Sequence, residues 1–315
     1  MRVIEVSNDL KQNVSKVMVG CDKATELVFM CLLTDGHVLL EDVPGTGKTM
    51  FAKTLAKCLN LDFKRIQFTP DLIPSDLIGV NFYNQAKGQF EFKRGPLFSQ
   101  LVLADEINRA APRTQSALLE AMEEKQISVE GTTTPLKKPF FVIATQNPVE
   151  NAGTFPLPEA QLDRFMIKMS LGYQDKKDEI ALLKTHSAHN PIDELSSIID
   201  VDTIDTLKDE VNNVMVSDAI YSYVVDIARA TREHAKISLG VSSRGSVQMI
   251  KCLKAYAAIQ GRDYVLPDDV KYLVPYVFGH RLIMNHLSFT DENNVYGILK
   301  EIMLQVQAPT EDFKS

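Results

Sequence analysis

Apolar residues recur along the chain at two different spacings, and these separate the expected strands from the expected helices. Short apolar runs, typical of buried parallel strands, occur at 38–40, 101–104 and 140–144. Residues 63–68 alternate apolar and polar side chains, as expected of a strand with one mostly buried face, and 166–169 is a further short strand. Strands that alternate with helices indicate an α/β fold with a parallel sheet.

Helical spacing connects these strands. Two helices are expected within residues 7–34, on either side of Val19-Gly20, and the same spacing returns after Lys48 and from about Arg113 to Lys125. From Gly172 onward the strand signals fade and helices dominate. The candidates are 176–188, 218–235, 245–260, 268–278 and 292–307. We therefore predict an α/β domain at 1–171 and a helical domain at 172–315.

Residues 69–95 interrupt the regular pattern. The segment is rich in Pro, Asp, Gly and aromatic residues, so it is too apolar for a linker and too broken for a single regular helix. We expect a structured insertion in which most of Tyr83, Phe90 and Phe92 are packed. A second irregular segment at 126–140 contains Gly131-Thr-Thr-Thr-Pro135 and predicts a hairpin.

The segment from Glu41 to Thr49, between an expected strand and an expected helix, carries the strongest chemical signal. Its glycines let successive backbone N–H groups turn toward one anion, and the N-terminus of the following helix favours negative charge. Lys48 is expected to neutralise the β- and γ-phosphates of ATP, and the hydroxyl of Thr49 to bind Mg²⁺. The predicted nucleotide contacts are Pro44, Gly45, Thr46, Gly47, Lys48, Thr49 and Met50.

Two positions near this loop have open interpretations. The strict phosphate-loop pattern begins with Gly six residues before the lysine, and this chain has Asp42 there. An acid beside the loop can modulate nucleotide affinity, but the sequence gives no direction. Val19 and Gly20 could pack against an adenine base, or they could form a plain turn between helices.

The apolar run at 101–104 ends in Asp105-Glu106. Buried parallel strands deliver their C-terminal residues to the ligand crevice at that edge of the sheet. We predict that Asp105 holds Mg²⁺ through its water shell and that Glu106 polarises the water that attacks the γ-phosphate. The alternative is a pair of solvated acids in a loop.

Three further polar residues each have a functional and a plain interpretation. Asn147 follows a strand, where its amide could orient the attacking water or touch the γ-phosphate, or could form an Asx turn before Pro148. Arg164 ends a short helix, either as a favourable cation there or as an arginine finger for a neighbouring subunit's ATP. Arg244 opens a helix, where a cation opposes the helix dipole; an ATP phosphate or a surface glutamate would resolve that conflict.

Composition narrows the choice of partners. The chain has 315 residues, enough for about two ordinary domains, and its 34 Lys plus Arg against 41 Asp plus Glu give a net charge of −7. This balance disfavours nucleic acid and membrane surfaces as main partners. The cysteines lack a Cys-x-x-Cys pair, so buried free thiols are expected. No run reaches the length of a membrane-spanning helix and no signal-peptide pattern is present, so we expect a soluble, cytoplasmic protein.

Five motifs together resemble the MoxR family of AAA+ ATPases. They are Glu41-Asp-Val-Pro-Gly-Thr-Gly-Lys-Thr49, Ala104-Asp-Glu-Ile-Asn-Arg-Ala110, Gln115-Ser-Ala-Leu-Leu-Glu-Ala-Met122, Ala144-Thr-Gln-Asn-Pro148 and Leu157-Pro-Glu-Ala-Gln-Leu-Asp-Arg-Phe165. The similarity covers nearly the whole chain, and the second and fifth motifs are far more specific than a phosphate loop alone.

This resemblance implies an αβα core with five parallel strands in the order 5-1-4-3-2, followed by an all-helical lid. It places residues 69–95 at the insertion in the second helix and 126–140 at the hairpin before the sensor strand. It also implies roles for Asn147 as sensor 1, Arg164 as arginine finger and Arg244 as the sensor 2 arginine. The family usually has Pro before that last arginine, where this chain has Ser243.

The function implied by the resemblance is ATP hydrolysis by a ring, typically a hexamer, that remodels a protein client such as one bearing a von Willebrand factor A domain. Two alternatives remain at this stage. The chain could be a nucleotide-gated binding switch in which hydrolysis is incidental, or a DNA-translocating motor. The net charge and the lack of an appended nucleic-acid domain count against the motor.

Overall fold

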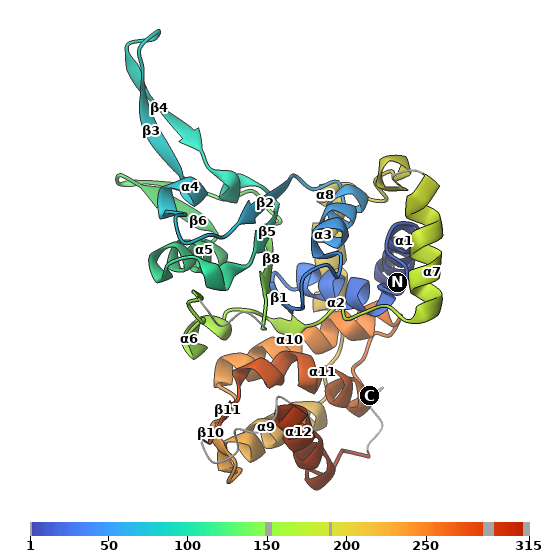
Figure 1. Ribbon diagram of the computed structural model, residues 1–315. Helices are drawn as coiled ribbons and strands as arrows, with labels where there is room; N and C mark the ends of the chain where they lie inside the picture. Colours follow the sequence, from blue (N-terminus) through green and yellow to red (C-terminus); the bar gives the residue numbers. More distant parts are fainter. Residues whose placement is uncertain (1, 149–152, 189–190, 286–292, 311–315) are drawn as a thin grey trace.

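A five-stranded parallel sheet forms the centre of the N-terminal half (Figure 1). The computed structural model describes residues 2–148, 153–188, 191–285 and 293–310. Within them the strands of the sheet lie in the order β2-β5-β8-β1-β9. Their bounds are β1 Val38–Glu41, β2 Phe63–Gln67, β5 Leu101–Asp105, β8 Phe141–Gln146 and β9 Ile167–Met169. Counted along the chain this is the order 5-1-4-3-2, so the predicted topology is confirmed.

Side chains on the central strands alternate between two hydrophobic clusters, as the two-residue period of a strand requires. Leu101 and Leu103 belong to a cluster with helices α1 (Arg2–Ser15), α2 (Asp22–Leu33) and α3 (Lys48–Cys58). Val102 and Ala104 belong to a second cluster on the opposite face, with α5 (Pro112–Glu124). Because both faces are covered, these strands are apolar throughout. The first helix begins at Arg2, earlier than predicted, since Val3 and Val6 extend its buried stripe.

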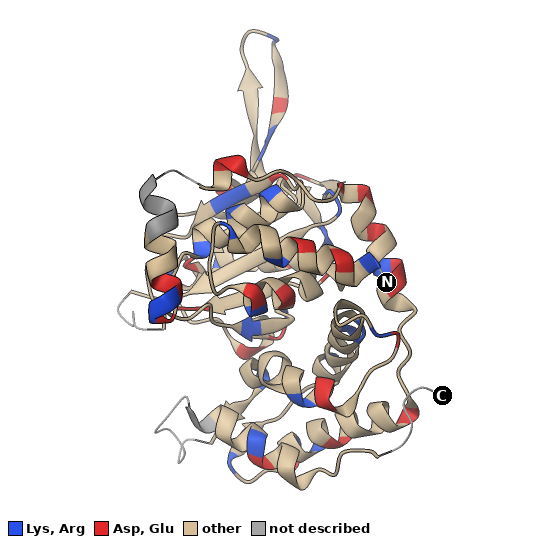
Figure 2. Ribbon diagram, turned by 90° about the vertical axis from the view of Figure 1, so that its right-hand side faces the viewer, with Lys and Arg blue, Asp and Glu red and all other residues tan. Residues whose placement is uncertain are grey.

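The insertion at 69–95 folds as a short helix followed by an antiparallel hairpin. Helix α4 (Pro74–Ile78) leads into β3 (Gly79–Asn84) and β4 (Gln89–Arg94), which project from the rest of the molecule in both ribbon views (Figures 1 and 2). The prediction that the aromatic residues here are mostly packed was wrong. Tyr83 is 53% exposed, Phe90 74% and Phe92 37%, because a two-stranded ribbon has no core of its own to cover them.

A second, shorter hairpin follows α5, as predicted. It consists of β6 (Gln126–Val129) and β7 (Thr132–Pro135), joined at Glu130-Gly131, where both residues have positive φ. Short 3₁₀ turns at Pro96–Phe98 and Ile107–Arg109 and the helix α6 (Glu159–Leu162) complete this half.

Within the described residues, the C-terminal half is helical apart from one small ribbon and an isolated β-bridge between Met215 and Tyr264. Its helices are α7 Lys176–Ala188, α8 Val201–Asn212, α9 Asp218–Glu233, α10 Ser243–Ile259, α11 Pro267–Phe278 and α12 Asn293–Gln305, with 3₁₀ turns at Pro191–Glu194 and Gly279–Arg281. The strands β10 (Ile237–Leu239) and β11 (Ile283–Met284) form a two-stranded antiparallel sheet that was not predicted. Helices α8 and α10 pack against α1 and α2, so one core joins the two halves.

Helix α8 was also missed by the sequence analysis. Its buried stripe is narrow, consisting of Ile204, Leu207 and Val211 among polar residues.

The four cysteines are free and buried, as predicted. Within the described residues, no helix is both long enough and apolar enough to cross a membrane.

Candidate nucleotide site

The phosphate loop lies between the end of β1 and the start of α3. Gly45 and Gly47 have φ of +88° and +84°, a conformation that L side chains rarely adopt. A Cβ on Gly47 would also come within 2.7 Å of the Met18 side chain. Helix α3 begins at Lys48, directly after this turn, so its N-terminal N–H groups lie at the loop. The predicted strand, loop and helix are all present.

The side chain of Lys48, at the end of the phosphate loop, folds back over that loop. Its ammonium group donates to the main-chain oxygens of Asp42, at 2.9 Å, and of Val43, at 3.2 Å. Neither acceptor carries a full charge. A phosphate group would therefore offer this lysine a much stronger partner than its present ones.

A cavity of about 370 Å³ adjoins the loop. It is lined by Met18, Gly45, Thr46, Gly47, Met50, Gly172, Tyr173, Gln174, Glu179 and Leu182. One end is therefore polar backbone, and the rest is largely apolar, which suits a nucleotide with its phosphates at the loop.

Val19 and Gly20 lie next to this cavity without lining it. The carbonyl of Val19 accepts a hydrogen bond from the Gln174 side chain at 2.9 Å. Gly20 has φ of +78°, and a Cβ there would meet Asp178 at 2.5 Å. The turn between α1 and α2 thus supports the segment 172–178, which borders the cavity. Of the residues near this turn, Met18 lines the cavity.

Asp105, at the end of β5, is buried and has partners on two sides. One carboxylate oxygen accepts the Thr145 hydroxyl at 2.7 Å, and the other accepts from the Arg65 guanidinium at 2.6 and 3.1 Å. Arg65 lies on β2 and Thr145 on β8, the two neighbours of β5 in the sheet. Asp105 is therefore fixed by side chains from both adjacent strands.

Glu106 follows in a left-handed conformation, with φ of +58°. Its backbone N–H donates to the hydroxyl of Thr145 at 2.8 Å, and its carboxylate accepts from Gln67 at 2.8 Å and from Arg109 at 3.2 Å. The carboxylate is thus held at the C-terminal ends of the strands by β2 and by the turn that follows β5. Asn147 is buried directly after β8, at the same edge.

Parallel pairing brings these groups together. Glu41 pairs with Gln146, and Ala104 pairs with Ala144, so β1, β5 and β8 end side by side. The phosphate loop, Asp105-Glu106 and Asn147 therefore leave the sheet at one edge, as predicted.

The two arginines lie elsewhere. Arg164 contacts one oxygen of Glu123 at 3.1 Å, and Arg244 contacts the other, also at 3.1 Å. Together they line a cavity of about 300 Å³ that shares no lining residue with the cavity at the phosphate loop. The sequence left two candidate counter-ions for Arg244, an ATP phosphate and a surface glutamate. In the structure the counter-ion is the glutamate, Glu123.

The residues predicted to hold Mg²⁺ suit a hard cation in their chemistry. The Thr49 hydroxyl lies in the first turn of α3, and the Asp105 carboxylate is an oxygen ligand at the same edge of the sheet. In the part of the chain that the structure describes, no group of three or more His, Cys, Asp or Glu side chains could hold a metal by itself. Mg²⁺ is usually bound through one or two protein carboxylates together with substrate phosphates and water.

Sequence reasoning missed Arg65, Gln67 and Glu123 as parts of the site. Arg65 and Gln67 do carry a weak signal, since they flank Ile66 and so share the exposed face of β2. Nothing in the local sequence indicates that Glu123 meets two arginines 41 and 121 residues away.

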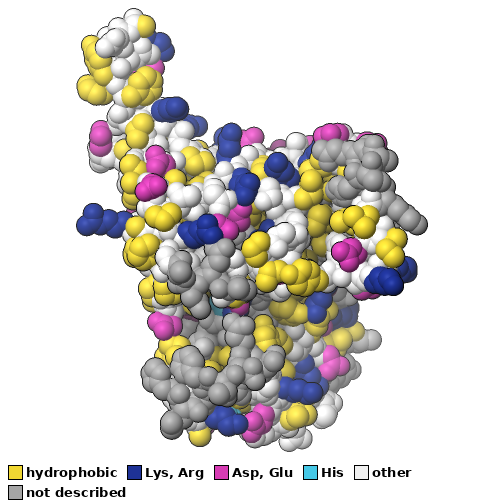
Figure 3. Space-filling view, in the orientation of Figure 1, with side chains coloured by type: hydrophobic (Ala, Val, Ile, Leu, Met, Phe, Trp, Pro, Cys, Tyr) yellow, Lys and Arg dark blue, Asp and Glu magenta, His cyan; other side chains and the backbone are white. Residues whose placement is uncertain are grey.

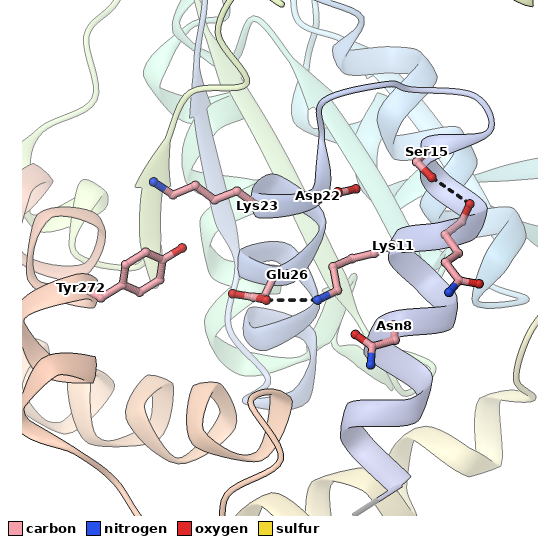
Figure 4. Close-up of a pocket in the computed structure, with 8 residues that line it drawn as sticks. Asn8, Lys11, Ser15, Asp22, Lys23, Glu26 and Tyr272 are labelled. Atoms are coloured by element: carbon pink, nitrogen blue, oxygen red, sulfur yellow. Dashed lines mark hydrogen bonds and ion pairs between the residues drawn. The ribbon is translucent and has the colours of Figure 1, made fainter. Parts of the chain in front are cut away.

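A third cavity, of about 570 Å³, is lined by none of the predicted site residues. It lies among α1, α2 and α11 and is lined by polar side chains, including Lys11, Glu26 and Tyr272 (Figure 4). Lys11 is paired with Glu26 at 3.4 Å, and Lys23 points toward the ring of Tyr272, 5.4 Å from its centre. Ser15, from the same lining, donates its hydroxyl to the main-chain oxygen of Gln12 at 2.9 Å.

A phosphate loop after β1 of a parallel sheet, with an acidic pair at the end of β5 and a helical C-terminal half, defines the P-loop AAA+ class. Comparison with family models agrees. Residues 37–167 match the ATPase family associated with various cellular activities (AAA), and residues 229–302 match the AAA lid domain.

Individual relatives narrow this class further. The chain is 48% identical to the uncharacterized protein YeaC of Bacillus subtilis over 95% of this chain and 94% of that protein. It is 38% identical to Chaperone MoxR1 of Mycobacterium tuberculosis over 94% of this chain and 80% of that protein. A crystal structure from Cytophaga hutchinsonii, of a protein named for an inferred ATPase activity, has a TM-score of 0.91 and 41% identity and covers 98% of this chain and 96% of that one. The chain belongs to the MoxR family of AAA+ ATPases.

Proposed function

We propose that this protein hydrolyses ATP with Mg²⁺ and uses the cycle to remodel a protein client. The observation that carries the proposal is the edge of the sheet where β1, β5 and β8 end together. Lys48 and the loop would bind the phosphates, and Thr49 and Asp105 would hold Mg²⁺, which would supply positive charge beside the phosphates. Glu106 polarises the attacking water, and Asn147 orients it.

The arginines complete the site of a neighbouring copy in a ring, for which a hexamer is our proposal. Arg164 and Arg244 share Glu123 and line a cavity separate from the phosphate loop of their own chain. A second copy that inserts its bound nucleotide there would offer phosphate in place of that glutamate. Phosphate is the stronger partner for two guanidinium groups, because it carries more charge and more acceptor oxygens.

The projecting β3–β4 hairpin is our candidate for the client contact. Its apolar side chains are exposed along the ribbon (Figure 3), and Tyr83 and Phe90 form a cross-strand aromatic pair with ring centres 5.3 Å apart. Exposed aromatic residues on a rigid ribbon are typical of protein contacts. A client with a von Willebrand factor A domain is the candidate that the family resemblance offers.

The test of hydrolysis is Glu106→Gln. The variant keeps the size of the side chain but removes the base, so ATP should bind normally while turnover falls by about 100-fold or more. Glu120→Gln, on the exposed side of α5, is the matched control and should turn over ATP at the wild-type rate. Near-normal turnover by Glu106→Gln would remove Glu106 from the mechanism. If instead Glu106→Gln lost turnover but still supported the client in cells as well as the wild type does, the protein would be a nucleotide-gated switch.

A further inference from the structure

The carboxylate of Asp42 turns away from the phosphate loop toward the segment that follows β9. One oxygen accepts from the Ser170 hydroxyl at 2.6 Å and from the Gly172 N–H at 3.1 Å, and the other accepts from the Leu171 N–H at 2.8 Å. The side chain is buried, with 4% of the residue exposed. Three donors on one buried carboxylate form a strong and directional contact.

The segment held in this way forms one wall of the cavity at the phosphate loop. Gly172, Tyr173 and Gln174 line that cavity together with the loop residues, Met18 and Met50. Gly172 has φ of +72°, so the chain turns sharply at a residue whose N–H donates to Asp42. Gln174 then bonds to the Val19 carbonyl, which fixes the far end of the same wall.

The main chain of Asp42 serves the phosphate side of the site. Its carbonyl oxygen accepts from the ammonium group of Lys48 at 2.9 Å. One residue therefore connects the phosphate-binding lysine, through its backbone, with the wall beyond the phosphates, through its side chain.

We propose that Asp42 is a positioning residue that holds the 170–174 wall against the nucleoside part of ATP. The inference rests on the proposed nucleotide site and assigns separate roles to two parts of it. The loop binds the phosphates, and the Asp42 carboxylate sets how tightly the base and ribose are gripped. The strict phosphate-loop pattern has Gly at this position, which has no side chain to make such a contact.

The competing account is electrostatic, because a carboxylate near phosphates should repel them. The two accounts differ in what they predict for a ligand without base or ribose. Binding of MgATP and of magnesium tripolyphosphate, measured by calorimetry on the full chain, separates them. For Asp42→Asn we expect MgATP to bind about 10-fold or more weakly, and tripolyphosphate to change by less than about twofold.

Ser170→Ala provides a second variant that leaves the charge at Asp42 intact. It removes one donor to the carboxylate and should weaken MgATP in the same direction by a smaller factor, again without affecting tripolyphosphate. Glu41→Gln is the matched control. It removes the adjacent negative charge, which pairs with Lys168 at 2.7 Å rather than with the wall, and should leave the ratio of the two affinities unchanged.

Other outcomes overturn the inference in distinguishable ways. Tighter binding of both ligands by Asp42→Asn would establish repulsion, and an equal weakening of both would place the effect in the loop itself. No change in Asp42→Asn or Ser170→Ala would leave the wall without a role in binding. A wild-type protein that binds ATP no better than tripolyphosphate would contradict only this inference, whereas one that binds neither would contradict the proposed function.

Discussion

At the end of β5, the carboxylates of Asp105 and Glu106 are held by side chains from β2. Arg65 contacts Asp105 and also donates to the amide oxygen of Gln67 at 2.8 Å, and Gln67 in turn donates to Glu106. A continuous series of hydrogen bonds therefore connects Asp105, proposed to hold Mg²⁺, with Glu106, proposed to act as the base. Because Arg65 is a cation on the acid proposed to hold Mg²⁺, it competes electrostatically with the metal.

Arg65→Gln should consequently lower the Mg²⁺ concentration that gives half-maximal ATP turnover. Arg65 is partly exposed, and ion pairs of this kind contribute up to about 1 kcal/mol, so we expect a shift of roughly two- to five-fold. A Mg²⁺ titration of steady-state turnover at fixed ATP measures it. Lys64→Gln removes a charge from the same strand without touching Asp105 and should give the wild-type midpoint. A higher Mg²⁺ requirement in Arg65→Gln would mean that Arg65 orients Asp105 for the metal.

The residues of the site divide into those that sequence could identify and those that it could not. Lys48, Thr49, Asp105 and Glu106 were predictable because their spacing relative to a strand end carries the chemistry. Arg65 was not, because its partner is 40 residues away and the pairing of β2 with β5 is a property of the folded sheet. The role of Asp42 was open for the same reason, since its partners lie 128 to 130 residues further along the chain.

Among the elements, the 3₁₀ turn after α11 connects the helical half to the segment that carries Arg164. The guanidinium of Arg281 is 2% exposed and donates to the Asp163 carboxylate at 2.7 Å and to the Phe165 carbonyl at 2.6 Å. Asp163 also accepts from Ser242, the N-cap of the helix that carries Arg244, at 3.4 Å. Asp163 and Arg281 thus place both arginines relative to each other.

Replacing Arg281 should cost far more stability than replacing a surface arginine. Arg281→Met leaves the Asp163 carboxylate without its buried cation, and breaking a buried pair in this way costs about 3–5 kcal/mol in the free energy of unfolding. Arg229→Met, whose pair with Glu233 is largely exposed, should cost less than about 1 kcal/mol. Chemical denaturation of the two variants measures the difference. Equal small losses would show that Arg281 does not hold the two halves together.

Element prediction succeeded where the pattern was strong and failed where it was weak. The central strands and α9 were predicted closely, because continuous apolar runs and a regular buried stripe define them. Helix α8 failed because its stripe is narrow, and the β3–β4 hairpin failed because its side chains are apolar without being buried. The apolar side chains of that hairpin are exposed on a projecting ribbon instead of being packed in a core. The local sequence does not distinguish an exposed apolar strand from a buried one.

Across the whole molecule, the two halves share one core, while the phosphate loop and the two arginines lie at separate cavities. Helices α1 and α2 pack against α8 and α10, which ties the helical half to the sheet. The phosphate loop lines one cavity, and Arg164 and Arg244 line the other. Under the proposed mechanism a single chain would carry two parts of a site that a ring of copies would join.

The most direct test of this account is ATP turnover by an equimolar mixture of Glu106→Gln and Arg164→Ala subunits. Each variant alone should be nearly inactive, because one lacks the base and the other lacks the arginine, which contributes roughly 10³- to 10⁵-fold in rate where arginine fingers operate. In a mixed ring, sites that combine wild-type Glu106 from one subunit with wild-type Arg164 from its neighbour should recover about a quarter of the wild-type turnover. A mixture no more active than the sum of its parts, in rings shown to contain both variants, would contradict a site shared between subunits.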